Sequence, residues 1–227
     1  MATSADHRPA GPAVPAASLS ARRCHGNLDE ITDSERRALR PIGTTAHEIA
    51  VQTAGLLSEL FSFPSVRIFH GIRPAEASQP RIPHAINAGN RLILVDSVAW
   101  PPGEYTTALS GQIYCDNRYI GQSVVPMITA VQHWRAILPT DHQVIGMVIV
   151  HPTPDRTVAP APPAPTSADL FWARAHEAVR DLSSRLPPGR QPVSLPAMSA
   201  LVAATSGGRN PVDARAMLIT EDPAFGR

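Results

Sequence analysis

Asp96 is the residue of this sequence whose surroundings most require a chemical explanation. It follows the apolar run Leu92–Val95 and precedes Ser97-Val98-Ala99. An unpaired carboxylate inside such a strand is costly, so its charge must meet a partner, a cation or water. Two interpretations stay open. Asp96 belongs to a functional or relic active site, or it is a strand-end residue that accepts hydrogen bonds from a neighbouring loop.

The basic residues narrow the chemistry further. All 20 of them are arginine, and the 227-residue chain contains no lysine. Mechanisms that need a catalytic lysine are therefore excluded, whether the lysine forms a Schiff base, binds phosphate in a Walker motif or assists phosphodiester hydrolysis. The sequence also lacks a Gly-x-Ser-x-Gly nucleophile motif and a Gly-rich phosphate loop.

Charge, cysteine content and hydropathy exclude further classes of protein. The formal net charge is +1, which argues against a histone-like or polybasic membrane binder. The two cysteines, Cys24 and Cys115, are too few for a Cys-rich zinc module and predict no disulfide framework. No apolar run approaches the roughly 20 residues that span a bilayer. We therefore expect a cytoplasmic protein with no membrane partner.

Periodicity and turn signals predict alternating helices and strands that would position Asp96. Thr45-Ala46-His47-Glu48 matches a capping box and starts an amphipathic helix over 45–60. Residues 87–90 form the turn of a hairpin between strands at 82–86 and 91–98. The other predicted elements are helices at 33–40, 124–138, 167–186 and 196–204, strands at 65–72, 144–150 and 157–160, and a hairpin of 105–109 with 112–115.

This order predicts an α/β fold with a mixed central β-sheet flanked by helices. A single domain is expected over 28–205, with its core at 43–152 and its C-terminal helices at 167–204. Residues 1–27 are rich in Ala, Pro and Ser and are predicted to be a disordered tail. Residues 206–227 are predicted to be a second, loose tail.

The order of the elements and three short motifs resemble the NERD (nuclease-related domain) family of the PD-(D/E)xK nuclease-like superfamily. The Glu on the family's first helix is matched by Glu48. The family's Ile-Asp-His strand is matched by Ile82-Pro83-His84, with Pro83 in place of Asp. Its Glu/Asp-x-Lys motif before an aromatic residue is matched by Asp96-Ser97-Val98, with Val98 in place of Lys.

The resemblance covers residues 43–152. Within it, the segment from Trp100 to Gln122 looks like a NERD-like branch of actinobacterial proteins in which the nuclease motifs are similarly eroded. The resemblance implies a PD-(D/E)xK nuclease-like sandwich whose site would hold a hard divalent cation, Mg²⁺ or Mn²⁺.

On this resemblance, the catalytic residues are Glu48 and Asp96, and the metal ligands are Glu48, His84 and Asp96, with Glu76 as a further candidate. Structural alternatives remain open for two of them. Glu48 is also the third residue of a capping box, and a lone histidine on a hairpin is often a satisfied structural residue. Arg91 does not replace the lysine, because it lies five residues before Asp96 and points to the opposite face of the strand.

Three functions are compatible with these residues. The first is a NERD-like domain with weak or absent nuclease activity that binds nucleic acid or a protein. The second is a divalent-metal-dependent DNA nuclease with a lysine-free site, and the third is a protein-interaction module. Residues 42–157 contain seven Arg and eight Asp or Glu, so this part of the chain has no excess of basic residues. DNA binding would therefore depend on a local cluster of basic side chains such as Arg67, Arg73, Arg81 and Arg118.

Overall fold

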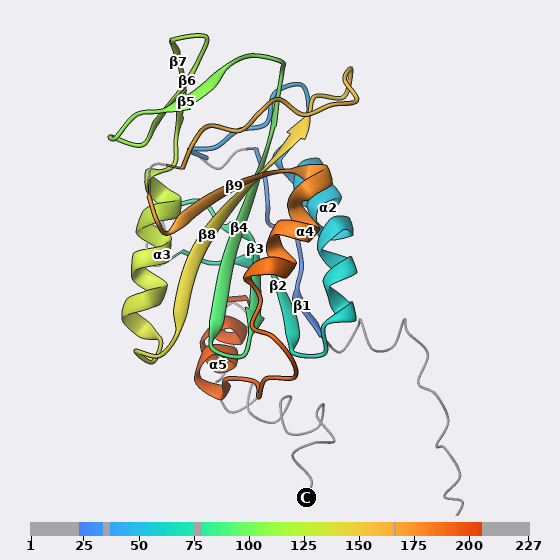
Figure 1. Ribbon diagram of the computed structural model, residues 1–227, viewed down its shortest axis with the longest axis vertical. Coiled ribbons are helices and arrows are strands. Elements are labelled where there is room, and N and C mark those ends of the chain that lie inside the picture. The colour runs from blue at the N-terminus through green and yellow to red at the C-terminus, as the bar shows by residue number, and fades with distance from the viewer. Residues whose placement is uncertain (1–22, 34–36, 75–78, 166, 206–227) are drawn as a thin grey trace, which may run out of the picture.

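A mixed six-stranded sheet with helices on both faces forms the body of the computed structural model, which describes residues 23–33, 37–74, 79–165 and 167–205 (Figure 1). The strand order is β1-β2-β3-β4-β8-β9. Strands β2 to β4 are antiparallel, whereas the β1–β2, β4–β8 and β8–β9 pairs are parallel. The strands are β1 Cys24–Gly26, β2 Val66–Ile72, β3 Ile82–Ala88, β4 Arg91–Trp100, β8 Gln143–Pro152 and β9 Leu170–Arg174. The predicted α/β class with a mixed central sheet is confirmed.

Helices cover the two faces of the sheet as separate layers. One layer holds α2 (Ala46–Leu57), the 3₁₀ helix η1 (Ser58–Ser62) and α4 (Ala175–Arg185). The other holds α3 (Val125–Ile137) and α5 (Leu195–Thr205). Figure 1 shows α2 and α4 on one side of the strands and α3 on the other. Among the described residues, no helix combines the length and the apolar composition that crossing a membrane requires.

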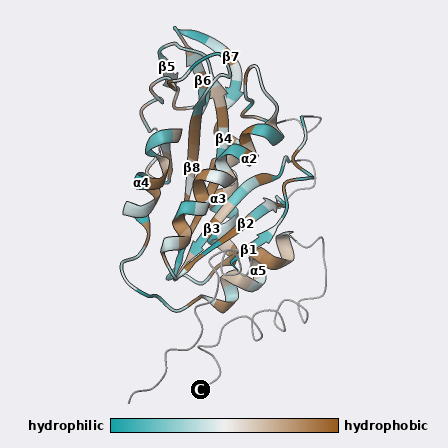
Figure 2. Ribbon diagram, turned by 90° about the vertical axis from the view of Figure 1, so that its right-hand side faces the viewer, coloured by the Kyte–Doolittle hydropathy of each residue, from teal (hydrophilic) through white to brown (hydrophobic). Residues whose placement is uncertain are grey.

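Strand β4 is central because both of its faces are apolar. Leu92 and Leu94 are buried in the layer of α3 and α5, whereas Ile93 and Val95 are buried in the layer of α2 and α4. Such a strand must lie inside the sheet, and β4 pairs with β3 on one side and β8 on the other. The apolar colour of β4 and β8 in Figure 2 follows from this double burial. The predicted central strand and its hairpin with β3 are confirmed.

A second, three-stranded antiparallel sheet projects from one end of the molecule (Figure 1). It consists of β5 (Tyr105–Thr107), β6 (Gln112–Cys115) and β7 (Arg118–Ser123). The β5–β6 hairpin was predicted. The third strand was not, because its turn is built by Asp116 and Asn117 at φ 48° and 62° rather than by glycine. Asp and Asn adopt this left-handed region more readily than most residues, which permits a two-residue turn here.

The predicted helix at 167–186 is wrong in its first part. Residues 170–174 form β9, which pairs in parallel with β8, and the helix begins only at Ala175. Ser167 does not start a helix, because its side chain and carbonyl accept from Asp169 N–H and Leu170 N–H in a turn before the strand. The apolar spacing of residues 170–174 also fits a helix, but pairing with the edge of β8 stabilises a strand there.

Three further sequence predictions need correction. Residues 24–26, predicted to be part of a disordered tail, form β1, and the predicted strand at 157–160 contains no strand residues. In the predicted helix 33–40, residues 37–40 are not helical, and 34–36 lie outside the described residues. Asp33 instead accepts from Ala46 N–H at 2.7 Å and so caps α2. The remainder of the tail, 1–22, and the tail 206–227 lie outside the described residues.

Candidate functional site

Asp96 is paired with an arginine from a distant part of the chain. Its Oδ1 accepts from Arg37 Nη2 at 2.9 Å and from the N–H of Ser97 at 2.8 Å. The two side chains are only 5% (Arg37) and 14% (Asp96) exposed. The charge that the sequence places in an apolar strand is therefore compensated by a guanidinium, and this is the partner that Asp96 required.

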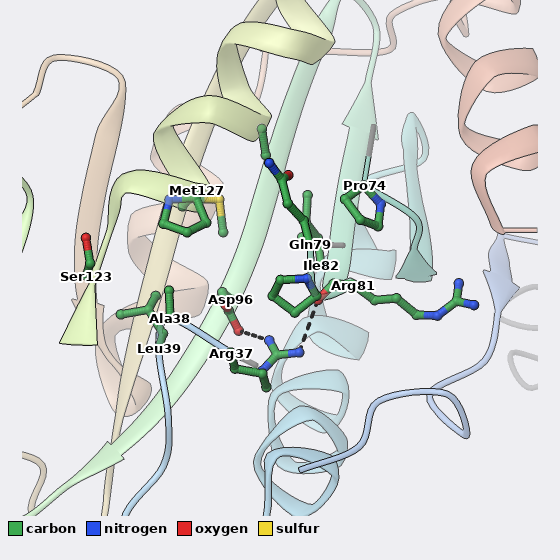
Figure 3. Close-up of a pocket in the computed structure, with 13 residues that line it drawn as sticks. Arg37, Ala38, Leu39, Pro74, Gln79, Arg81, Ile82, Asp96, Ser123 and Met127 are labelled. Atoms are coloured by element: carbon green, nitrogen blue, oxygen red, sulfur yellow. Dashed lines mark hydrogen bonds and ion pairs between the residues drawn. The ribbon is translucent and has the colours of Figure 1, made fainter. Parts of the chain in front are cut away.

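Arg37 is held in place by more than Asp96. Its Nη1 donates to the carbonyl of Arg81 at 3.1 Å, so one guanidinium joins β4 to the residue just before β3. Figure 3 shows both contacts as dashed lines and shows the Arg81 side chain pointing away from Asp96. Arg81 forms its own ion pair with Glu30 and donates to the carbonyl of Gly71 at 3.4 Å. Each of the two guanidiniums therefore has its own carboxylate partner, Asp96 for Arg37 and Glu30 for Arg81.

Only a small hollow lies beside the Arg37–Asp96 pair. The described residues around it leave about 30 Å³, which is room for a water-sized group. An adjoining hollow of about 140 Å³ shares Pro74, Gln79, Ile82 and Ala130 with it and continues along α3 toward Trp134. The described walls therefore enclose less space than the roughly 300 Å³ at the lower limit of small-molecule sites.

His84 lies on the other side of the sheet from Asp96. Its cross-strand partners are His70 on β2 and Val95 on β4, and directly paired residues share a face. Asp96 is the next residue after Val95 and therefore points to the opposite face. His84 is fully buried, and its Nδ1 lies 2.7 Å from Nδ1 of His70. One ring donates and the other accepts, which requires at least one neutral imidazole.

A second polar group lies on the same face as His84, beneath α2. Thr53 Oγ1 is 2.7 Å from Ser97 Oγ and 2.9 Å from His151 Nε2. Burial lowers the pKa of His151 to about 4 and that of His70 to about 4. Burial, and then the neighbouring His70, also hold the pKa of His84 well below its usual value. All three histidines are therefore neutral at pH 7.

Glu48 is the third residue of the capping box that the sequence predicted. Its Oε2 accepts from Thr44 Oγ1 at 2.6 Å and from Thr45 N–H at 2.9 Å, while its own N–H donates to Thr45 Oγ1. The hydrogen bond from Thr44 makes the largest contribution to lowering the pKa of this exposed carboxyl group. Its side chain is thus turned back on the start of α2, and the structural alternative for Glu48 accounts for its contacts.

The expected metal ligands Glu48, His84 and Asp96 do not converge. Asp96 faces the α3 layer, His84 the α2 layer, and Glu48 lies on the exposed start of α2. Within the described ranges, no group of three or more His, Cys, Asp or Glu side chains could hold a metal ion. Glu76, the further candidate, lies outside the described residues. The metal trio is therefore a prediction that the geometry does not support, because strand alternation separates His84 from Asp96.

Arg37 is the site residue that sequence reasoning missed. Arg91 does not replace the lysine of the related motif, and no pattern in the sequence points to a residue 59 positions before Asp96 as its partner. Such a contact depends on the path of the 37–40 segment. That path is fixed by backbone pairing of Ser123 N–H with the Ala38 carbonyl and by Gln122 Nε2 with the Arg40 carbonyl. None of these contacts is local in sequence.

Comparisons with known proteins found no family model, no curated protein and no solved structure that matches the chain.

Removing Arg37 should destabilise the protein strongly, since it leaves the Asp96 carboxylate buried without a counter-charge. We expect Arg37→Ala to lower the free energy of unfolding by about 3 kcal/mol in urea denaturation. The double variant Arg37→Ala/Asp96→Ala should lose less than the sum of the two single variants. Arg156→Ala, which breaks an exposed pair with Asp155, is the matched control and should change the free energy of unfolding far less than Arg37→Ala does. Equal losses for Arg37→Ala and Arg156→Ala would contradict the account.

The buried histidines predict a loss of stability in mild acid. The native pKa values of about 4 for His70 and His151 lie below the ordinary 6.5 of an unfolded histidine. The unfolded state therefore binds more protons below pH 6.5, and stability present above that pH is lost as the pH falls toward 4. Unfolding free energy measured across this range should fall, with a shallower slope for His151→Gln. An exposed control, His176→Gln, should keep the slope of the parent protein, and a flat profile for the parent would refute the assignment.

Proposed function

We propose that this chain is a NERD-like domain that has lost nuclease chemistry and serves as a protein-binding module. The Arg37–Asp96 ion pair is the observation that supports the loss of nuclease chemistry. In the related motif, the acidic residue at this position belongs to the site for a divalent cation. Here a guanidinium already neutralises the carboxylate. A cation would have to displace a buried arginine that makes two hydrogen bonds, one to Asp96 and one to the carbonyl of Arg81.

The residues around Asp96 support the same conclusion. Val98 stands where the motif has lysine, and it is fully buried in the apolar layer beneath α3. Pro83 stands where the motif has its first Asp, and it offers no side-chain ligand. Activation of a water by a metal needs several oxygen ligands, and orientation of that water is a usual role of the lysine. Both requirements are missing at this point of the sheet.

The proposed protein-binding role is supported by the β5–β7 sheet. Two of its apolar side chains face solvent: Leu109, between β5 and β6, is 98% exposed and Tyr119 is 54% exposed. The adjoining Val125, at the start of α3, is 46% exposed. Tyr114 and Tyr119 lie side by side with ring centroids 5.8 Å apart. Exposed aromatic and aliphatic side chains on a projecting hairpin are typical of a surface that contacts another protein.

Charge favours a protein over DNA at this surface. Residues 104–123 carry one basic side chain, Arg118, against Glu104 and Asp116, a balance of −1. Affinity for DNA comes largely from basic residues that neutralise phosphates, and this sheet supplies almost none. The basic cluster considered from the sequence is also partly engaged, because Arg67 and Arg81 donate to backbone carbonyls.

A cleavage assay tests the loss of nuclease chemistry. Purified protein is incubated with plasmid and linear DNA in Mg²⁺ or Mn²⁺, beside the double variant Glu48→Ala/Asp96→Ala. We expect no cleavage above the background of the double variant. Metal-dependent cleavage by the parent protein that disappears in the double variant would overturn the proposal and restore the metal-dependent nuclease alternative.

A binding assay separates the two kinds of partner. Fluorescence anisotropy with labelled single- and double-stranded DNA should show no saturable binding even at about 50 mM salt, where phosphate contacts are strong. The variant Arg118→Ala is the matched control for residual electrostatic attraction. Saturable binding that weakens with salt and with Arg118→Ala would show that the β5–β7 sheet contacts DNA instead of a protein.

A further inference from the structure

Asp141, His142 and Ser194 form a chain of hydrogen bonds at the end of the molecule away from β5–β7. His142 Nε2 lies 2.7 Å from Ser194 Oγ, and His142 Nδ1 lies 3.0 Å from Asp141 Oδ1. The first two residues lie in the connection from α3 to β8, and Ser194 immediately precedes α5. A hydroxyl, an imidazole and a carboxylate are thereby placed in the order that nucleophilic catalysis by serine requires.

Backbone contacts fix both segments that carry these side chains. His142 N–H donates to the carbonyl of Pro139 at 2.9 Å, and Asn90 Nδ2 donates to the carbonyl of Asp141 at 2.9 Å. Ser194 is held by the start of α5, where its carbonyl accepts from Met198 N–H at 2.9 Å. The His142 side chain is 4% exposed. The relative position of imidazole and hydroxyl is therefore set by the fold.

The protonation pattern follows from the partners. A carboxylate oxygen accepts, so we assign the proton shared with Asp141 to Nδ1 of His142. Nε2 is then the unprotonated nitrogen and accepts from the hydroxyl of Ser194. Ser194 Oγ also accepts weakly from Ala197 N–H at 3.4 Å, as a helix-capping serine does, and this leaves its own proton for His142. The tautomer is the one that a general base needs.

The three side chains line a hollow beside the start of α5. It measures about 530 Å³, within the roughly 300–1,000 Å³ typical of small-molecule sites. Its other walls are mostly uncharged and include Gly89, Pro139, Pro192, Val193 and Pro196. A hollow of this size and lining suits a small, uncharged ester with an apolar acyl group.

We propose that Ser194 is a nucleophile activated by His142, with Asp141 as the positioning residue, and that the site cleaves small acyl esters. Ser194 Oγ attacks the ester carbonyl carbon while its proton passes to His142 Nε2. The tetrahedral intermediate collapses, the carbon–oxygen bond to the alcohol breaks, and His142 returns the proton to the leaving alcohol. Solvent water then attacks the acyl-serine, gives one proton to His142 and releases the carboxylic acid, and that proton restores the Ser194 hydroxyl.

The proposal is independent of the Arg37–Asp96 site. Asp141 is 72% exposed, so its orientation of the imidazole competes with water. We therefore expect a smaller effect from Asp141→Asn than from removal of the base or the nucleophile. General-base activation contributes typically 10²–10⁴-fold, which sets the expected loss for a His142 variant at about 100-fold or more.

The test uses the full chain with a fluorophosphonate probe, which labels activated serines, and with p-nitrophenyl acetate. Peptide mapping should locate the label on Ser194. The variant Ser194→Asn keeps a good helix cap but has no hydroxyl, so it should fold normally and lose both labelling and acyl transfer. His142→Gln should lower both rates by about 100-fold or more. Ser184→Ala, an exposed serine that donates to the carbonyl of Asp181, is the control and should change neither rate.

The outcomes decide between a nucleophile and a structural brace. If Ser194 only caps α5 and His142 only braces it, the probe will label nothing above the level of heat-denatured protein, and the proposal is wrong. Labelling that persists in Ser194→Asn would also overturn it. Because none of these variants touches Asp96 or β5–β7, a negative result leaves the proposed function standing, and DNA cleavage by the chain would leave the serine site standing.

Discussion

The structure depends on the need to neutralise Asp96 inside a strand that is apolar on both faces. The chain meets this need with Arg37, which donates to the carboxylate at 2.9 Å and to the carbonyl of Arg81 at 3.1 Å. The segment around Arg37 must therefore lie against the second half of β4, where Ile42 N–H also donates to the carbonyl of Ala99. There it also pairs with β7 through the Ala38 carbonyl and with Gln122 through Arg40. One buried ion pair thus helps to tie the projecting β5–β7 sheet to the body of the protein.

The two faces of the sheet separate residues that the sequence places close together. Val95 and Asp96 are neighbours, yet one lies with His84 beneath α2 and the other with Arg37 beneath α3. The α2 face keeps its buried polar groups neutral by pairing them with one another, as His70 with His84 and Thr53 with His151. The α3 face compensates a formal charge with its opposite. A shared cation between the two faces is sterically excluded by the sheet itself.

Local sequence patterns predicted the elements that are marked by a local capping motif or by an unbroken run of buried apolar residues. The capping box of Thr45 and Glu48 located α2, and the unbroken apolar run of β4 located the centre of the sheet. Strand β9 was missed because its spacing also fits a helix and only the free edge of β8 decides between them. The partner of Asp96 could not be predicted, since 59 residues separate it from Arg37 and no periodic signal links them.

The Ser194 site escaped prediction for a related reason. A Gly-x-Ser-x-Gly motif marks a serine on a strand-to-helix turn, whereas Ser194 precedes a helix within Val193-Ser194-Leu195-Pro196. Its partners, Asp141 and His142, lie about 50 residues earlier in the chain. They are adjacent to each other in sequence, so their spacing matches no recognised motif. The fold thus carries two sites to which we assign different roles. One is the Asp96 carboxylate paired with Arg37, which we propose is a metal centre that has lost its function, and the other is the proposed nucleophile Ser194 beside His142.

We propose that Arg37 takes the place of a cation at Asp96, and metal binding tests this proposal most directly. Mn²⁺ is titrated into the full chain and into Asp96→Asn, and the electron paramagnetic resonance signal of free Mn²⁺ is followed. We predict that the two titrations coincide, because the Asp96 carboxylate is already neutralised. A Mn²⁺ ion bound stoichiometrically by the parent protein and lost in Asp96→Asn would contradict the account and return Asp96 to the role of a metal ligand.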